Sequence, residues 1–170
     1  EIHCDLIMPG HTFTSFASLS EENAANTMTC IAPSKTFNLA GLEASCVILP
    51  DRERRHQLKA EMSRVSYEGR VNALGYKAME AAYTRCDQWL SQAIQAIHSN
   101  HRLLTEFLKE HCPDVKAAPL EGTYLQWLDL RALGWTPKEQ ESIMEEADLF
   151  FDEGGMFCLL YTSPSPRDCS

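Results

Sequence analysis

The residue of this sequence whose type and setting best suit chemistry is Lys35, which lies between two apolar runs, residues 28–31 and 46–49. Pro33 disfavours helix at the residue before it and Asn38 tolerates tight backbone, so we expect Lys35 on a turn at the edge of a sheet. Apolar neighbours there would desolvate the amine and favour its neutral form, which can attack an aldehyde to form a Schiff base. The other interpretation is a solvated surface charge, the commoner role of a lone lysine in a loop.

The segment around this lysine, S-K-T-F-N-L-A-G over residues 34–41, resembles the cofactor-lysine segment of the fold-type-I pyridoxal-phosphate enzymes, the aspartate aminotransferase superfamily. Within that superfamily it is similar to the carbon–sulfur β-lyases of the PatB/MalY type, the cystathionine β-lyase branch. The resemblance implies that Lys35 holds pyridoxal 5'-phosphate through a Schiff base and that Ser34 donates to the cofactor phosphate.

A second motif stands at the start of the sequence, where Glu1-Ile2-His3 resembles the D-E-I-H motif of the same superfamily. The resemblance implies that His3 lies near the phenolic oxygen of the cofactor. The aspartate that pairs with the pyridinium nitrogen would stand one place before Glu1, and Asp5 is too far along the motif to replace it. A histidine at a strand end with no role is the alternative interpretation of His3.

One position departs from the aminotransferase pattern. Many aminotransferases of this fold carry an arginine eight residues after the lysine, where it grips the cofactor phosphate, but this sequence has Glu43 there. A carboxylate cannot bind phosphate by charge, so the departure favours the lyase branch over a plain aminotransferase.

Periodicity and capping residues predict the elements that position these side chains. Residues 1–6 are expected to end a strand, with Pro9-Gly10 as the following turn, and Ser20 to cap a short helix. Further strands are expected over residues 26–31, 44–49 (buried), 115–117 and 123–130. Further helices are expected over residues 51–67, 71–83, 87–111 and 136–148, with Asp51 as the cap of the first and Thr136, followed by Pro137, as the cap of the last.

Two stretches near the C-terminal end bear on the domain organisation. The phrase E-G-T-Y-L-Q-W-L-D-L-R over residues 121–131 resembles the small-domain strand of the lyase branch. Residues 158–170 turn to Ser and Pro without periodicity, so we expect them to be disordered and non-native, and Arg167 is not taken as the arginine that clamps the substrate.

Composition bounds the function classes. A net charge of −9 argues against nucleic-acid binding, because few cations would neutralise phosphates. No apolar run approaches a membrane span, and the first residues lack a basic signal-peptide region, so a cytoplasmic protein is expected. The seven cysteines form no C-x-x-C pair and are expected to be reduced core residues, and His98 and His101 lack the further ligands of a metal site.

The resemblance therefore implies an α/β chain that is a fragment of the pyridoxal-phosphate-dependent transferase fold. Residues 1–84 would be the C-terminal part of the large domain and residues 85–157 most of the small α+β domain. The implied activity of the parent protein, a homodimer, is β-elimination on a sulfur amino acid such as cystathionine. A pyridoxal-phosphate-dependent aminotransferase is the alternative, and a catalytically inactive fragment is the alternative of another class.

Overall fold

The computed structural model describes residues 1–67, 71–152 and 154–157. Contacts divide the chain into two units, Glu1–Leu128 and Asp129–Ser170. The expectations for residues 158–170, including Arg167, lie outside the described residues. The expected domain boundary between residues 84 and 85 stays a prediction.

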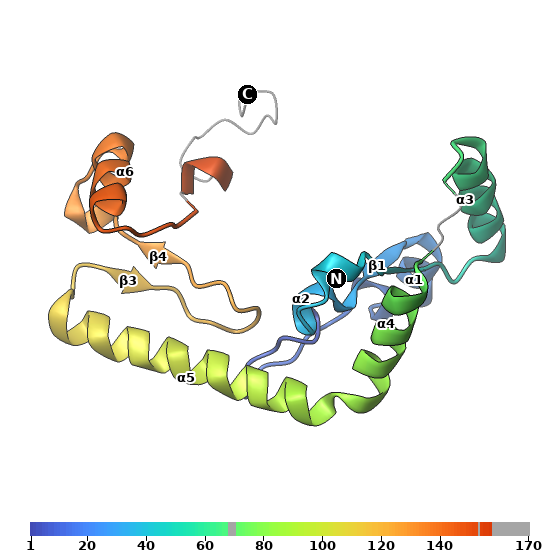
Figure 1. Ribbon diagram of the computed structural model, residues 1–170, viewed down its shortest axis with the longest axis horizontal. Helices are drawn as coiled ribbons and strands as arrows, with labels where there is room; N and C mark the ends of the chain where they lie inside the picture. Colours follow the sequence, from blue (N-terminus) through green and yellow to red (C-terminus); the bar gives the residue numbers. More distant parts are fainter. Residues whose placement is uncertain (68–70, 153, 158–170) are drawn as a thin grey trace. The chain divides into compact units, whose positions relative to one another are not determined.

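The first unit holds most of the regular structure (Figure 1). Its helical segments are η1 (Phe16–Ser18), α1 (Glu21–Asn26), α2 (Pro33–Thr36), η2 (Ala40–Leu42), α3 (Arg52–Arg64), α4 (Ala73–Arg85) and α5 (Asp87–His111). Its strands are β1 (Thr29–Ile31), β2 (Cys46–Ile48) and β3 (Lys116–Ala117), with β4 (Leu128–Asp129) starting at its last residue. The second unit continues with η3 (Arg131–Leu133), α6 (Pro137–Glu146) and η4 (Gly154–Phe157).

Side-chain caps begin the helices where the sequence predicts them. Ser20 Oγ accepts from the Asn23 backbone N–H at 3.0 Å, and Asp51 accepts from the Arg54 N–H at 2.7 Å. Each cap satisfies a backbone donor that the first helical turn leaves unpaired. The predicted caps of α1 and α3 are thus confirmed.

The long helix α5 begins and ends at the residues that the periodicity predicts, Asp87 and His111. Cys112 is its C-cap, and the helix does not continue through Pro113, because proline lacks the N–H that another turn requires. His101 on this helix hydrogen bonds through Nδ1 to Gln126 Oε1 at 2.5 Å. No residue of α5 is buried, although its aliphatic side chains follow a helical stripe.

A small core forms where the first residues meet a later segment of the first unit. Leu6 is 1% exposed and Met8 is 2% exposed. Ile7 forms an isolated antiparallel bridge with Gly122, and the Thr123 N–H donates to the Leu6 carbonyl at 2.7 Å. These backbone bonds join two segments that are more than a hundred residues apart in the sequence.

The strand expected over residues 1–6 is wrong. These residues form successive turns, in which the Cys4 N–H donates to the Glu1 carbonyl and the Leu6 N–H to the His3 carbonyl. Within the described ranges, the only bridge in this region lies one residue further on, at Ile7. A strand requires a ladder of bonds to a neighbour, and in the described chain Leu6 alone among residues 1–6 takes part in the bonding beside the Ile7 bridge, through its carbonyl.

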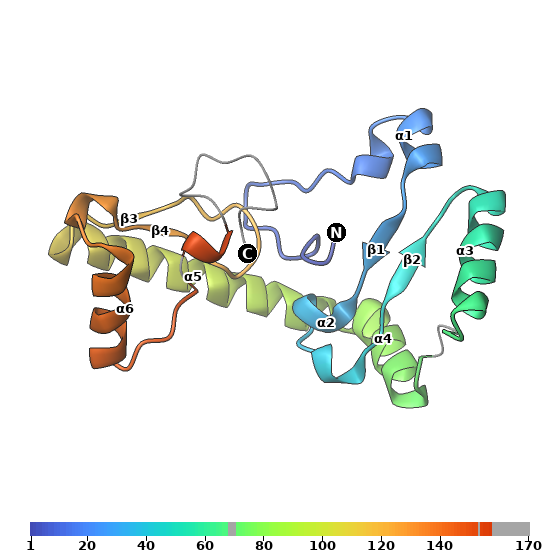
Figure 2. The ribbon, with the colours of Figure 1, turned by 90° about the horizontal axis from the view of Figure 1, so that it is seen from above.

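The buried strand expected over residues 44–49 is only partly correct. β2 pairs with β1 in antiparallel register, with Cys30 opposite Val47, and the two strands lie side by side in Figure 2. Val47 is 47% exposed and Ile48 is 48% exposed. The two strands form a two-stranded sheet, which no third strand of the described chain joins, and its apolar side chains at Val47 and Ile48 are exposed.

Helix α4 lies very close to η2, the short helix that follows the lysine segment. Asn72 caps α4, and its Nδ2 also donates to the Leu42 carbonyl at 2.9 Å. A Cβ added to Gly75 would stand 2.6 Å from that same carbonyl oxygen. Further along α4, the Tyr83 ring meets the Phe37 ring edge to face, with centroids 5.5 Å apart. Helix α4 thus packs directly on the backbone that follows Lys35.

The second unit begins α6 with the cap that the sequence predicts at Thr136, and the structure shows it as a capping box. The Thr136 hydroxyl accepts from the Glu139 N–H, and the Glu139 carboxylate accepts from the Thr136 N–H at 2.8 Å. Pro137 occupies the first helical position, where its missing N–H is not required. In the part of the chain that the structure describes, no helix combines the length and the apolar character of a membrane span.

Candidate active site

Lys35 lies on α2, a single helical turn that the local sequence encodes. Ala32 is extended and Pro33 starts the helix, and the Phe37 N–H closes the turn on the Pro33 carbonyl at 2.9 Å. Asn38 then takes a left-handed backbone with φ of 54°, as the expected tight backbone requires. The predicted turn is thus a one-turn helix. Lys35 is exposed, so the described residues do not desolvate its amine.

The residue after the lysine fixes this turn to the start of the chain. Thr36 is 1% exposed, and its Oγ1 donates to Asp5 Oδ2 at 2.9 Å. The two residues are 31 positions apart. Sequence reasoning considered Asp5 only as a substitute for the pyridinium partner and missed this contact, because nothing in the local pattern indicates which residue Thr36 meets.

His3 lies against a residue of the 121–131 segment, which resembles the small-domain strand of the lyase branch. Its ring meets the Tyr124 ring edge to face, with centroids 5.8 Å apart. Its Nε2 is buried and has no hydrogen-bond partner among the described residues. A buried ring nitrogen without a partner is costly, so this atom is suited to a polar group that the described chain does not provide.

Asp5 influences the titration of two neighbours. Partial burial raises the pKa of the Cys4 thiol, and the Asp5 carboxylate raises it further. Burial also raises the pKa of Tyr83 to about 12, with smaller contributions from Asp5, Cys4 and Cys46. Both groups are therefore neutral near pH 7, which argues against either as a nucleophile or base there.

The remaining predicted residues lie on the same stretch as Lys35. Ser34 is half-buried on α2. Glu43 is exposed and left-handed, with φ of 50°, at the position where many aminotransferases carry an arginine. Of the described residues, no group of three or more His, Cys, Asp or Glu could hold a metal ion. The five cysteines in the described ranges are free thiols and none of them is buried, so their expected core positions are wrong.

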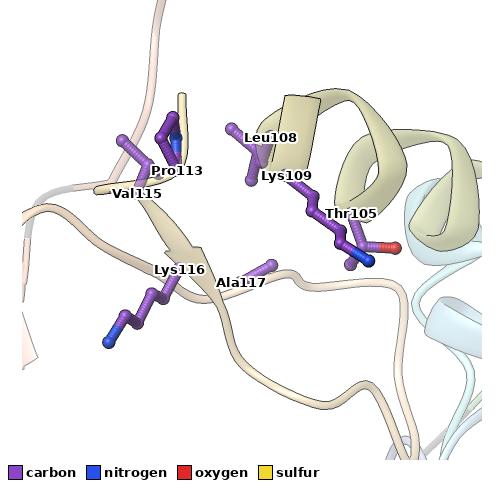
Figure 3. A pocket seen from close by; sticks show the side chains of 7 residues that line it. All are labelled: Thr105, Leu108, Lys109, Pro113, Val115, Lys116 and Ala117. Atoms are coloured by element: carbon purple, nitrogen blue, oxygen red, sulfur yellow. The ribbon is translucent and has the colours of Figure 1, made fainter. Parts of the chain in front are cut away.

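A pocket of about 380 Å³ lies elsewhere in the first unit, between the C-terminal part of α5 and β3 (Figure 3). Its apolar wall consists of Leu108, Pro113 and Val115. The pocket is also lined by Lys109 and Lys116. None of Lys35, His3 and Ser34 lines this pocket. The predicted site residues instead lie on α2 and in the first turns of the chain.

No protein-family profile matches the chain. It is 41% identical over 155 residues to the cystathionine beta-lyase PatB of Bacillus subtilis, an alignment that covers 91% of this chain and 40% of that protein.

Solved structures that share its fold include the following two. The structure of cystalysin from Treponema denticola, which contains pyridoxal 5'-phosphate, superposes with a TM-score of 0.86 and 44% identity, covering 92% of this chain and 40% of that one. A pyridoxal-phosphate-bound candidate aminotransferase of Clostridium difficile superposes with a TM-score of 0.90 and 37% identity, covering 94% and 41% of the two chains.

The chain thus spans about 40% of the length of the proteins it matches. The superpositions confirm the expected α/β fold and the expectation that the chain corresponds to one part of it.

Proposed function

We propose, from the premise that this chain belongs to the fold-type-I superfamily of pyridoxal-phosphate-dependent enzymes, that the whole protein is a carbon–sulfur β-lyase. The observation that carries the proposal is the exposed Lys35 on α2, in a chain 41% identical to a cystathionine beta-lyase. Cystalysin, at 44% identity, contains pyridoxal 5'-phosphate. The substrate class we propose is a sulfur-bearing amino acid such as cystathionine.

The residues present fit pyridoxal phosphate by their chemistry. Lys35 offers an exposed primary amine that can join the cofactor aldehyde. His3 Nε2 is buried without a partner and is suited to hydrogen bond the phenolic oxygen of the ring. Ser34 stands next to Lys35 and would donate its hydroxyl to the phosphate. These three residues are the proposed cofactor contacts of this chain.

The bound cofactor would supply an electron sink for the carbanion formed at the substrate Cα. Lys35 would be the residue of this chain that acts in catalysis. Its Nζ would hold the cofactor between turnovers and would accept the Cα proton of the substrate as a general base. Cleavage of the bond between the β-carbon and sulfur, followed by hydrolysis, yields a thiol, pyruvate and ammonia.

An aminotransferase is the second candidate, and the similarity to the Clostridium difficile protein favours it. The exposed carboxylate of Glu43 favours the lyase, because an arginine expected of many aminotransferases is absent at that position. The two activities separate in one assay of the full-length protein. A lyase releases pyruvate from cystathionine without any keto-acid acceptor, whereas an aminotransferase requires the acceptor.

We further propose that the full-length protein is a cytoplasmic homodimer. Residues 1–84 would lie in its large domain and residues 85–157 in its small domain. We expect the 170 residues alone to be inactive, because they correspond to about 40% of the related proteins. Adding pyridoxal phosphate to the isolated chain should then give no lysine-linked absorption band, whereas the full-length protein should give one.

Borohydride reduction of the full-length protein with its cofactor tests the assignment of Lys35. Reduction should fix the cofactor on the peptide that contains Lys35, as read by peptide mass spectrometry. Lys35→Arg should abolish the adduct, whereas the control Lys59→Arg, which changes an exposed lysine of α3, should retain it. An adduct on another lysine in the unmodified protein would overturn the proposed function.

A further inference from the structure

We propose that Asp5 is a positioning residue, whose carboxylate holds Lys35 in place through the hydroxyl of Thr36. The inference rests on the proposed function of Lys35, which it extends to a residue outside the cofactor contacts. It concerns the geometry of the lysine rather than the identity of the cofactor.

The bond between the two side chains is part-buried, and its donor is almost fully buried. Thr36 Oγ1 donates to Asp5 Oδ2 at 2.9 Å, and Thr36 is 1% exposed. A hydroxyl buried to this extent is costly without a partner, and a bond to a carboxylate is stronger than one to a neutral acceptor. Thr36 therefore has a strong preference for the position that keeps this contact.

The lysine helix depends on such a contact, because it consists of one turn. A single turn is marginal by itself, since nucleation fixes several dihedral angles for one hydrogen bond. The backbone bonds at α2 run from the Phe37 N–H to the Pro33 carbonyl and from the Leu39 N–H to the Ser34 carbonyl. The bond from Thr36 to Asp5 joins this turn to a segment 31 residues earlier.

Asp5 can hold Thr36 in place because the next residue, Leu6, is itself held by contacts. Leu6 is 1% exposed, and its carbonyl accepts from the Thr123 N–H at 2.7 Å. The charge of the Asp5 carboxylate also contributes to the raised pKa of Cys4 and of Tyr83. A continuous series of contacts thus runs from residue 123 through Leu6 and Asp5 to Thr36, next to Lys35.

Single and double variants of the full-length enzyme with its cofactor test the proposal, with L-cystathionine as substrate. Thr36→Val keeps the shape of the side chain and removes the donor. It should lower kcat about tenfold or more, the loss expected for a hydrogen bond to a charged group, and leave KM within about twofold. The isotope effect on kcat with α-deuterated substrate should rise, because proton transfer to a displaced Lys35 becomes slower.

Matched variants separate positioning from stability. Thr36→Ser keeps the hydroxyl and should restore most of kcat, whereas Thr105→Val removes a hydroxyl on α5 and should change neither kcat nor the isotope effect. Asp5→Asn should also lower kcat, and the Thr36→Val/Asp5→Asn double variant should be no slower than Thr36→Val alone. Any one of three results would overturn the proposal. The losses in kcat of Thr36→Val and Asp5→Asn could multiply in the double variant, the isotope effect could stay unchanged in Thr36→Val, or Thr36→Ser could be as slow as Thr36→Val.

A second readout does not use turnover. In the full-length protein without cofactor, Thr36→Val should speed hydrogen exchange at the Phe37 and Leu39 amides, and Thr36→Ser should not. Equal exchange in all variants would overturn the role of the bond. If borohydride fixes no cofactor on Lys35, the proposed function fails, and this exchange measurement still decides whether Asp5 and Thr36 hold α2.

Discussion

The lysine-bearing region and the long helix α5 reach their conformations in different ways. At the lysine, a one-turn helix is joined to the start of the chain through Thr36, and Leu6 and Met8 form a small but almost fully buried core. Helix α5 has 25 residues, and none of them is buried. The shorter element depends on distant contacts, whereas the longer one is specified by its own sequence.

The difference teaches where the geometry of the site comes from. Helical periodicity and a terminating proline suffice to define α5. No local signal defines the orientation of Lys35, because it depends on residues that only the fold brings together. Changes near Leu6 should therefore affect the lysine region strongly, and comparable changes on α5 should affect it little.

The largest effect on stability is expected from truncating a core leucine, and truncating a surface leucine of α5 is its control. Leu6→Ala in the full-length protein should lower the free energy of unfolding by about 2–5 kcal/mol, because it leaves a cavity in the core. Leu103→Ala on α5, where the leucine is 68% exposed, should change it by about 0.5 kcal/mol or less. Urea unfolding of the two variants measures both values. An equal cost would mean that other parts of the full-length protein cover this face of α5.

A smaller effect is expected at a locally specified element. Thr136→Ala removes the capping box of α6 and should destabilise that helix by about 1 kcal/mol. Hydrogen exchange of the α6 amides should accelerate, whereas exchange of the amides in α2 and α5 should stay unchanged. Faster exchange in α2 would contradict the view that α6 and the lysine-bearing region are specified independently of each other.

The smallest effect concerns Tyr83, which lies beside the lysine region. Because burial raises its pKa to about 12, the folded protein keeps this proton longer than the unfolded chain does. Its contribution to stability is fully present below about pH 10, the unfolded value, and is lost as the pH rises through about 12. Ultraviolet titration of phenolate should show one late tyrosine, which Tyr83→Phe removes. Loss of a different, earlier transition in that variant would refute the assignment.

The sequence predicts the elements that are specified by nearby residues better than those that depend on distant contacts. The bounds of α5 and the caps at Ser20, Asp51 and Thr136 are confirmed, because each depends on residues within a few positions of one another. The chain's place in a known fold was predictable from the lysine segment, and the superpositions confirm it.

Features that require distant partners were not predictable. Residues 1–6 form turns rather than a strand, and β2 is exposed although its run of apolar residues predicts a buried strand. The contact from Asp5 to Thr36 was missed for the same reason, since neither residue carries a signal that identifies the other. The roles of Lys35, His3 and Ser34 stay predictions.

The contact between Gly75 and Leu42 has a consequence for attempts to make this protein more heat-stable. Replacing a helical glycine by alanine is a common stabilising substitution, because alanine has the higher helix propensity. At position 75 the new methyl group would stand 2.6 Å from a backbone oxygen, which cannot rotate away as a side chain can. A thermostability screen that replaces helical glycines should therefore lose this variant, although the residue lies outside the proposed cofactor contacts.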